Sequence, residues 1–200
     1  KSTALRVAAG LLAPTRGGVT FDGRDISGVS VEQRVHEGLV LVPGGQGVLT
    51  SLTAGENLRL AGWVLRRDPT ALAATTEEVL TLFPALKDRL HTLAGSLSGG
   101  ERQMLTIAQA LHCRPRVLMI DELSLGLAPT IVAQLLEVVR GLVAKGVTVV
   151  VVEQSLNLAT SVANRSVFME RGQVRFTGAT DELVRRPDLL RSVFLGSAPG

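Results

Sequence analysis

The amino-acid sequence predicts an α/β fold built on a parallel β-sheet. Two continuous apolar runs, Arg116–Ile120 and Val147–Val152, have the length and composition of buried strands. Between them, Ile131–Lys145 has the apolar spacing of a helix. A strand, a helix and a second strand in that order are typical of a parallel sheet with both faces covered. The 200 residues, 46% of them hydrophobic, are enough for one domain that buries a core.

The elements before residue 53 follow from apolar spacing and from turn residues. The expected elements are a helix at Lys1–Leu12, a strand at Val19–Phe21 that turns at Asp22-Gly23, a helix from the Ser30 cap to Val35 with Gln33 as capping-box partner, and a buried strand at Leu39–Val42.

From about residue 53 to residue 112, helical patterns replace strand patterns. Ala71–Leu82 and Arg102–Leu111 both have helical apolar spacing. Strands return at Arg116, and a closing hairpin is expected at Ser166–Met169 and Val174–Thr177. We therefore expect one domain over 1–200, with a core formed by both ends of the chain and a helical sub-domain inserted near 53–112.

The composition excludes several classes of protein. A single cysteine, Cys113, excludes a disulfide scaffold. It fits a reducing, cytosolic compartment, although a secreted protein without cysteine would look the same. The longest apolar runs are far shorter than the ~18 residues of a membrane-spanning helix. The net charge of +3 comes from scattered basic residues, and aromatic residues make up 3% of the chain. No nucleic-acid partner is therefore expected.

An acidic pair, Asp121-Glu122, directly follows the strand at 116–120. In open α/β sheets, ligands bind outside the carboxyl ends of the strands, so this pair stands where a ligand is expected. One carboxylate can hold a divalent metal ion through water, while the other polarises an attacking water. A solvated turn after a core strand is the alternative that the pair alone leaves open.

The segment Leu97–Gln103 reads Leu-Ser-Gly-Gly-Glu-Arg-Gln and opens the helix expected at 102–111. The free N–H groups and the dipole at a helix start attract anions, and glycine lets a phosphate approach the backbone closely. The alternative is an ordinary helix start, with Ser98 as N-cap and Glu101 as its capping-box partner.

The first three residues, Lys1-Ser2-Thr3, have the form of the end of a phosphate loop, G-x-x-x-x-G-K-[ST], but alone they carry little weight. The chain resembles the nucleotide-binding domain of ABC transporters in the order and spacing of its motifs. These motifs are this tripeptide, the 97–103 segment, the acidic pair and a switch residue after the next strand. The resemblance covers essentially the whole chain and implies a P-loop NTPase (RecA-like) fold. Further segments are similar to the ATPases of branched-chain amino-acid importers: Val42-Pro43, Leu52-Thr53, Glu56-Asn57-Leu58, Ser124–Pro129 and Val152–Gln154.

The resemblance implies a role for each residue around ATP and Mg²⁺. Lys1 would contact the β- and γ-phosphates, Ser2 would ligate Mg²⁺, and Thr3 would touch a nearby phosphate. Asp121 would hold the metal ion through water. Glu122 would be the general base for the water that attacks the γ-phosphate, so that the protein is an ATP hydrolase.

Two further sets of residues complete the implied site. Gln154 stands where most of the family has a switch histidine, and it would hydrogen-bond the γ-phosphate without carrying a proton. Ser98, Gly99 and Gly100 would bind the γ-phosphate of ATP held by a second, facing domain. The implied partners are a second ABC ATPase subunit, in a homo- or heterodimer, and integral-membrane permease subunits. They would place the protein peripherally at the cytoplasmic face of the cell membrane.

The sequence departs from the family pattern at four places. The strand, aromatic residue and glycines that precede the phosphate-loop lysine are missing, so we expect a fragment that alone binds ATP poorly. Gly44 stands where the family has glutamine or glutamate, and Gln46 is the candidate to replace it if the glycine loop bends. Leu123 replaces a proline and is expected to loosen the turn after the acidic pair. Gly55 replaces an acidic residue near a helix start.

The expected function is the ATP-binding subunit of an importer for a small solute, branched-chain or other amino acids. The first alternative, motivated by Gly44 and Leu123, is a degenerate, regulatory ABC module that binds nucleotide and partner but hydrolyses weakly. The second is a soluble ABC protein of repair or translation, which is disfavoured because the insert at 53–112 is too short for a long coiled coil.

Isolated residues of reactive types are expected to be structural. His36, His91 and His112 have no metal-ligand spacing, so they are assigned to the surface or to packing. Trp63 is expected to pack within the helical segment.

Overall fold

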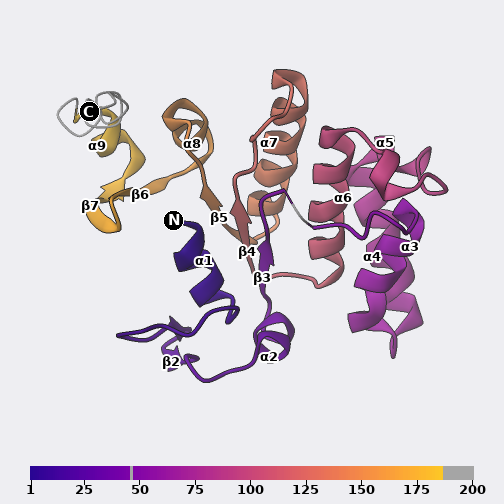
Figure 1. Ribbon diagram of the computed structural model, residues 1–200, viewed down its shortest axis with the longest axis horizontal. Coiled ribbons are helices and arrows are strands. Elements are labelled where there is room, and N and C mark those ends of the chain that lie inside the picture. The colour runs from indigo at the N-terminus through magenta and orange to yellow at the C-terminus, as the bar shows by residue number, and fades with distance from the viewer. Residues whose placement is uncertain (46, 187–200) are drawn as a thin grey trace. The chain divides into compact units, whose positions relative to one another are not determined.

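The computed structural model describes residues 1–45 and 47–186, and the chain divides into two compact bodies. The first body comprises Ser2–Val152, and the second comprises Lys1 and the residues from Glu153 onward. Each body contains β-structure of its own (Figure 1). Within the described residues, no helix is both long and apolar enough to cross a membrane.

The centre of the first body is a three-stranded parallel sheet in the order β3-β4-β5. The strands are β3 (Leu39–Val42), β4 (Val117–Asp121) and β5 (Thr148–Val152). Val42 pairs with Ile120, and Asp121 pairs with Val152. The three strands therefore end at one edge, which is the edge that the acidic pair follows. The parallel sheet predicted from the apolar runs is confirmed.

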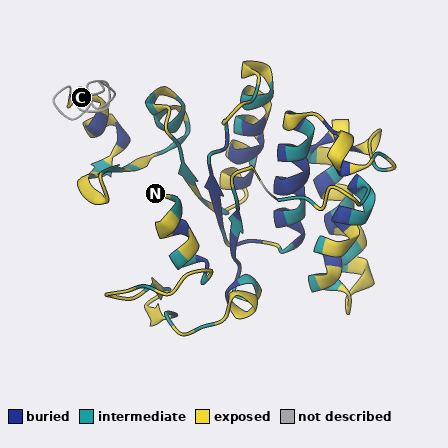
Figure 2. Cartoon of the chain, viewed as in Figure 1, coloured by how far each residue is buried: buried dark blue, intermediate teal, exposed yellow. Residues whose placement is uncertain are grey.

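Helices cover both faces of this sheet (Figure 1). These helices are α1 (Ser2–Ala8), α6 (Gly99–His112) and α7 (Pro129–Ala144). On one face, Leu5 of α1 shares an apolar cluster with Met119 of β4. On the other face, α6 and α7 pack around Leu118 and Ile120. Successive strand residues point to opposite faces, so the apolar residues 117–120 of β4 fill both cores, and Figure 2 shows the strand as buried.

The residues from 54 to 112 form helices, as their apolar spacing predicted. They are α3 (Ala54–Ala61), the 3₁₀-helix η1 (Gly62–Leu65), α4 (Pro69–Leu82), α5 (Pro84–Lys87), the 3₁₀-helix η2 (Ala94–Ser96) and α6. α3, α4 and α5 all contact α6, and α6 also contacts β3. α6 therefore joins the helical segment to the sheet, and the sub-domain expected at 53–112 stays a prediction.

A hairpin and a short helix connect α1 to β3. They are β1 (Thr20–Phe21), β2 (Arg24–Asp25) and α2 (Val31–His36). Asp22 and Gly23 both have positive φ, 49° and 77°, as the two-residue turn of such a hairpin requires. The Ser30 hydroxyl accepts a hydrogen bond from the N–H of Gln33, which confirms the predicted cap of α2.

The described part of the second body contains α8 (Leu156–Val162), β6 (Arg165–Glu170), β7 (Gln173–Ala179) and α9 (Thr180–Val184). β6 and β7 form the predicted antiparallel hairpin. Its turn again uses two residues of positive φ, Arg171 and Gly172. Both helices of this body were absent from the predicted elements.

Two predictions about the first body are wrong. α1 ends at Ala8 rather than at Leu12, because Gly10 has a φ of 81° and reverses the backbone. Trp63 is 64% exposed instead of packed, and the Arg66 guanidinium lies 4.9 Å from the centre of its ring. This cation–π contact gives the indole a partner without burial.

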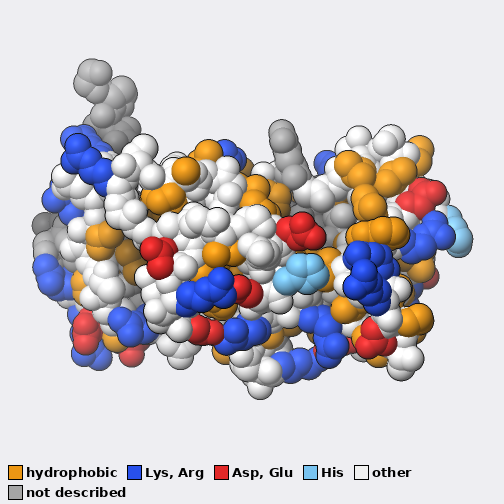
Figure 3. Space-filling view, turned by 90° about the horizontal axis from the view of Figure 1, so that it is seen from below, with side chains coloured by type: hydrophobic (Ala, Val, Ile, Leu, Met, Phe, Trp, Pro, Cys, Tyr) orange, Lys and Arg blue, Asp and Glu red, His pale blue; other side chains and the backbone are white. Residues whose placement is uncertain are grey.

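Charged side chains of both signs are interspersed on the face shown in Figure 3. Several form exposed ion pairs between neighbouring elements, such as Arg24 of β2 with Glu37, whose charged atoms are 3.0 Å apart. Exposed pairs of this kind contribute about 0–1 kcal/mol to stability.

Candidate functional site

The predicted metal ligands Ser2 and Asp121 meet at the carboxyl end of β4. The Ser2 hydroxyl donates a hydrogen bond to Oδ1 of Asp121 over 3.0 Å. Ser2 is the first residue of α1 and Asp121 is the last of β4, so the fold joins side chains 119 positions apart. Asp121 is only 7% exposed, and a buried carboxylate needs such a donor. The structure therefore brings together two oxygen ligands that the sequence separates.

Glu122 follows Asp121 in a left-handed backbone conformation, with a φ of 55°. For a residue other than glycine this conformation costs about 1–2 kcal/mol. The N–H of Glu122 donates to the carbonyl of Val152 over 2.9 Å, so β5 holds the turn in place. Backbone outliers of this kind cluster at active sites, and this one ends the strand alternation directly after Asp121, the predicted metal ligand.

The residue after the pair, Leu123, is completely buried in the main apolar cluster. The sequence predicted that leucine in place of proline loosens this turn. Burial of a leucine side chain contributes about 1.5–3 kcal/mol to stability. The buried side chain therefore anchors the turn to the core, whereas a proline would fix it by restricting φ.

Gly44 lies beside the acidic pair, two residues after β3. A Cβ atom added there would be 3.1 Å from the carbonyl oxygen of Asp121 and 3.7 Å from the Cβ of Glu122. A side chain at position 44 would thus start next to the expected general base, and glycine leaves that place without one. Gln46, the candidate to replace it, lies outside the described residues.

The start of α6 is closed by its own hydrogen bonds. The Ser98 hydroxyl accepts from the N–H of Glu101 over 3.2 Å, and the Glu101 carboxylate accepts from the N–H of Ser98 over 2.8 Å. The N–H and hydroxyl of Ser98, and then Arg89 at 2.9 Å, hold the pKa of Glu101 below its ordinary value. The predicted N-cap and capping box are confirmed.

The two glycines of this segment have different surroundings. Gly100 is buried, and a Cβ atom added there would be only 2.9 Å from Cγ2 of Ile131 in α7. Close packing of α6 on α7 therefore explains Gly100 without a ligand. Ser98 and Gly99 are exposed, and a Cβ atom at Gly99 would meet Leu127 at an ordinary 3.7 Å. The phosphate-binding prediction consequently depends on Ser98 and Gly99.

The remaining predicted phosphate ligands lie at the surface. Thr3 is exposed in the first turn of α1. In the second body, the Lys1 ammonium donates to the carbonyl of Glu153 over 3.1 Å. Gln154 is exposed and precedes Ser155, the N-cap of α8. The phosphate-binding roles of these three residues stay predictions.

Mg²⁺ fits the donor set of Ser2 and Asp121. When the ion is bound with a nucleotide it takes one or two protein ligands and completes its octahedron with water and phosphate oxygens. A hydroxyl and a carboxylate held 3.0 Å apart supply that number. The described residues contain no group of three His, Cys, Asp or Glu side chains suited to a metal ion.

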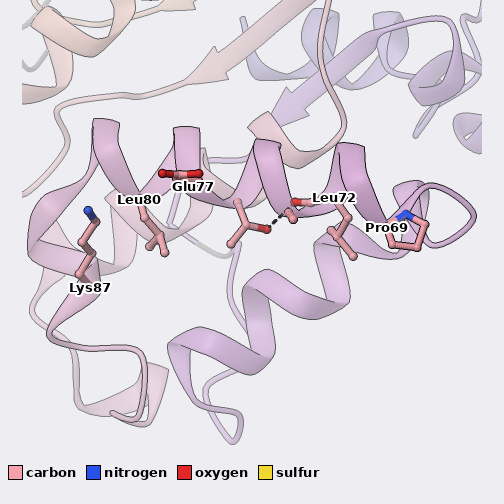
Figure 4. A pocket seen from close by; sticks show the side chains of 7 residues that line it. Pro69, Leu72, Glu77, Leu80 and Lys87 are labelled. Atoms are coloured by element: carbon pink, nitrogen blue, oxygen red, sulfur yellow. Dashed lines mark hydrogen bonds between the residues drawn. The ribbon is translucent and has the colours of Figure 1, made fainter.

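A largely apolar groove of about 590 Å³ runs along α4 (Figure 4). It is lined by Pro69, Leu72, Ala73, Thr76, Glu77, Leu80 and Lys87. The hydroxyl of Thr76 is already engaged, since it donates to the carbonyl of Leu72 over 2.8 Å. None of the predicted site residues lines this groove.

Two buried polar residues were not assigned a function from the sequence. Arg34 is 2% exposed and donates hydrogen bonds to five backbone carbonyls, although only its position in a short polar helix distinguishes it in the sequence. His112 is completely buried between Ala108 and Thr76, and burial lowers its pKa. Its predicted packing role is confirmed.

A parallel sheet with an acidic pair at its carboxyl edge, and a helix-opening serine against the first acid, is the arrangement expected of a P-loop nucleoside triphosphatase, and solved cassettes of that class share the fold. The family model described as ABC transporter matches residues 1–124. The chain belongs to this family, as the ATP-binding subunit of an ABC transporter.

Relatives with different transport roles resemble the chain. The high-affinity branched-chain amino acid transport ATP-binding protein BraG of Pseudomonas aeruginosa is 36% identical over 196 residues, which are 98% of this chain and 83% of the relative. The lipopolysaccharide export system ATP-binding protein LptB of Acidithiobacillus ferridurans is 30% identical over 198 residues, 98% of this chain and 80% of the relative.

Solved structures share the fold. An ATP-binding cassette of an ABC transporter superposes with a TM-score of 0.84 at 24% identity, covering 97% of this chain and 83% of that one. A dimeric cassette in a post-hydrolysis state, bound to ADP and Pi, superposes with a TM-score of 0.77 at 23% identity, covering 90% of this chain and 80% of that one.

Proposed function

We propose that the protein hydrolyses ATP to drive the uptake of a small solute, branched-chain or other amino acids. The observation that carries the proposal is the carboxyl end of β4, where Ser2 hydrogen-bonds Asp121 and Glu122 follows in a turn held by β5. These are the two ligand types that Mg²⁺ takes beside phosphates, next to a carboxylate able to accept a proton.

The residues of this site divide the chemistry among them. Ser2 and Asp121 would hold Mg²⁺, which would neutralise phosphate charge when it is bound with ATP. The Glu122 carboxylate accepts a proton from water as the water oxygen bonds to the γ-phosphorus and the bond to ADP breaks. The family resemblance gives phosphate-binding roles to Thr3, in the same body, and to Lys1 and Gln154, whose position relative to this site is left open.

The exposed start of α6 is available to contact a partner subunit. Ser98 and Gly99 are open to solvent, and the capping box leaves the N–H groups of the first helical residues without intrahelical acceptors. We infer that they bind the γ-phosphate of ATP held by a second ABC ATPase subunit. Closure of that dimer would move permease subunits, which place the protein at the cytoplasmic face of the membrane.

The proposed direction and cargo of transport are based on sequence similarity to relatives of named function. BraG is named for branched-chain amino acid transport and is more similar to this chain than LptB, which is named for lipopolysaccharide export. The importer-like segments around Val42-Pro43 and Ser124–Pro129 favour the same branch. Amino-acid uptake is therefore the proposal and lipopolysaccharide export the competing outcome.

The test uses the full-length protein reconstituted in liposomes with its permease. Glu122→Gln should lower ATP turnover by about 10²–10⁴-fold, because it removes the general base, while ATP affinity stays within about twofold. Glu137→Gln, an exposed carboxylate on α7, is the matched control and should turn over normally. Wild-type turnover in Glu122→Gln would refute the assignment, and uptake of labelled leucine would test the cargo.

A degenerate, regulatory module is the second candidate, favoured by the glycine at position 44 beside the acidic pair. Without a side chain there, one contact expected near the general base is lost, and hydrolysis would be weak. Steady-state turnover of at least about 1 s⁻¹ with the membrane partners would reject this candidate, since that rate is within the ordinary enzyme range.

A further inference from the structure

Arg34 is an arginine of α2 that lies buried between α1 and the loop after β2. Its Nη1 donates to the carbonyls of Val7, at 2.9 Å, and Ala8, at 2.7 Å, which end α1. Its other nitrogens donate to the loop carbonyls: Nε to Val29 at 3.0 Å, and Nη2 to Ile26 and to Ser27 at 3.2 Å.

These bonds use the full capacity of the guanidinium group. The group has five N–H donors, and five backbone carbonyls accept from it. The last carbonyls of a helix have no intrahelical donors, and the negative end of the helix dipole favours a cation. Arg34 is therefore a C-terminal cap of α1 that is supplied by another helix.

Gly10 makes room for this cap. Its φ of 81° is the left-handed conformation that favours glycine, and a Cβ atom added there would be 2.9 Å from Nε of Arg34. The end of α1 is thus shaped around the guanidinium, and a side chain at position 10 would displace it.

α1 depends on its contacts for its position. It has seven residues, fewer than an isolated helix needs for stability in water. Ser2 meets Asp121 at the first end, Leu5 packs against the sheet in the middle, and Arg34 holds the last end. A shift at the last end would be transmitted along two turns to the Ser2 hydroxyl.

We propose that Arg34 is a positioning residue of the Mg²⁺–ATP site: by fixing the C-terminal end of α1 it holds Ser2 in register with Asp121. The inference rests on the proposed function of Ser2 and Asp121. It adds a residue that touches neither the metal ion nor the nucleotide and acts through the backbone of the helix.

The test separates metal binding from nucleotide binding in the full-length protein. The ATP dissociation constant is measured by calorimetry in EDTA and again with saturating Mg²⁺. Arg34→Met should reduce the Mg²⁺-dependent gain in affinity by about tenfold, in the range found for groups that orient metal ligands, and leave the EDTA value within about twofold. Arg34→Lys keeps the charge without the fork of donors and should fall between.

A second readout needs no ligand. Amide hydrogen exchange in the nucleotide-free protein should accelerate within α1 in both Arg34 variants and stay unchanged in α6. Because Arg34→Met is the variant more prone to misfold, the exchange and calorimetry of Arg34→Lys decide the matter if Arg34→Met cannot be purified.

Three controls give the result its meaning. Arg24→Met removes an exposed arginine of the adjacent hairpin and should change nothing. Leu86→Ala destabilises the helical segment and should lower the melting temperature without changing the Mg²⁺-dependent gain. Ser2→Ala should lower that gain at least as much as Arg34→Met.

The outcomes separate the inference from the proposed function. If Ser2→Ala lowers the gain and both Arg34 variants leave it unchanged, Arg34 is only structural and the inference is overturned. If Ser2→Ala also leaves the gain unchanged, the proposed Mg²⁺ site itself is wrong and the inference fails with it.

Discussion

The two places where this protein is expected to meet ATP are held together in opposite ways. The Ser2–Asp121 contact joins side chains 119 positions apart and depends on the packing of α1 against β4. The start of α6 is closed within four consecutive residues, Ser98–Glu101, by its own capping box. One site is a product of tertiary structure and the other a product of local sequence.

The difference determines how each site should fail. A change at the end of β4 should abolish chemistry and leave the protein folded, because the residues there contribute reactive groups more than packing. A change at the start of α6 should first cost stability, because the same residues cap a helix that joins the helical segment to the sheet. The following variants test this contrast, from the largest expected effect to the smallest.

Asp121→Asn should have the largest effect. The amide fills the volume of the carboxylate and still accepts the Ser2 hydrogen bond, but it lacks the charge that holds Mg²⁺. We expect at least about a 100-fold loss of ATP turnover, the scale of removing one group aimed at transition-state charge, with little change in the urea midpoint. Steady-state hydrolysis and urea unfolding measure the two quantities, and near-normal turnover would remove Asp121 from the site.

Gly100→Ala tests the packing interpretation of the second glycine. The added methyl would lie 2.9 Å from Cγ2 of Ile131, so we expect a loss of about 1–3 kcal/mol in the free energy of unfolding. Gly99→Ala is the matched control, since its methyl meets Leu127 at 3.7 Å, and it should cost less than about 0.5 kcal/mol. Urea denaturation measures both, and equal costs would contradict the account.

Ser98→Ala should separate capping from phosphate binding. Loss of the cap should lower the unfolding free energy by about 0.5–2 kcal/mol. Thr53→Ala removes the equivalent capping box of α3 and should cost a similar amount. Only Ser98→Ala should also weaken ATP-dependent dimer formation, measured by light scattering, and a matching loss in Thr53→Ala would mean that stability alone explains the effect.

The smallest predicted effect is a pH dependence at the start of α6. The N–H of Ser98, its hydroxyl and Arg89 lower the pKa of Glu101 from its ordinary 4.5. The stability from the charged carboxylate is therefore complete above about pH 4.5 and is lost as the pH falls through the lowered value. Glu101→Gln keeps a capping-box side chain but cannot ionise, so the melting temperature of this variant should depend less on pH below pH 5. If its pH dependence equals that of the wild type, other carboxylates cause the dependence.

The sequence predicted most of the local features of the fold. The strand expected at Arg116–Ile120 is β4 at Val117–Asp121, and the caps at Ser30 and Ser98 lie where the residue types placed them. Apolar runs and capping side chains act over a few residues, so their signals are complete within the segment that they describe.

The wrong predictions and the missed residues concern features that depend on tertiary structure. The first helix was extended to Leu12 because its leucines keep helical spacing, but Leu11 and Leu12 are exposed and Gly10 ends the helix. The position of Arg34 in a short polar helix did not reveal its role, since its five acceptors come from segments that only the fold brings together. Ser2 and Asp121 were each predicted as Mg²⁺ ligands through family resemblance, and their hydrogen bond was not predicted from the spacing of the residues.

The central claim is that the acidic pair after β4 hydrolyses ATP, and single-turnover hydrolysis tests it most directly. The full-length Glu122→Gln protein, loaded with labelled ATP and Mg²⁺ alongside the wild type, should retain intact ATP while the wild type releases ADP and phosphate. If the variant produced labelled ADP at the wild-type rate, the general base would lie elsewhere and the site described at the end of β4 would not be the catalytic one.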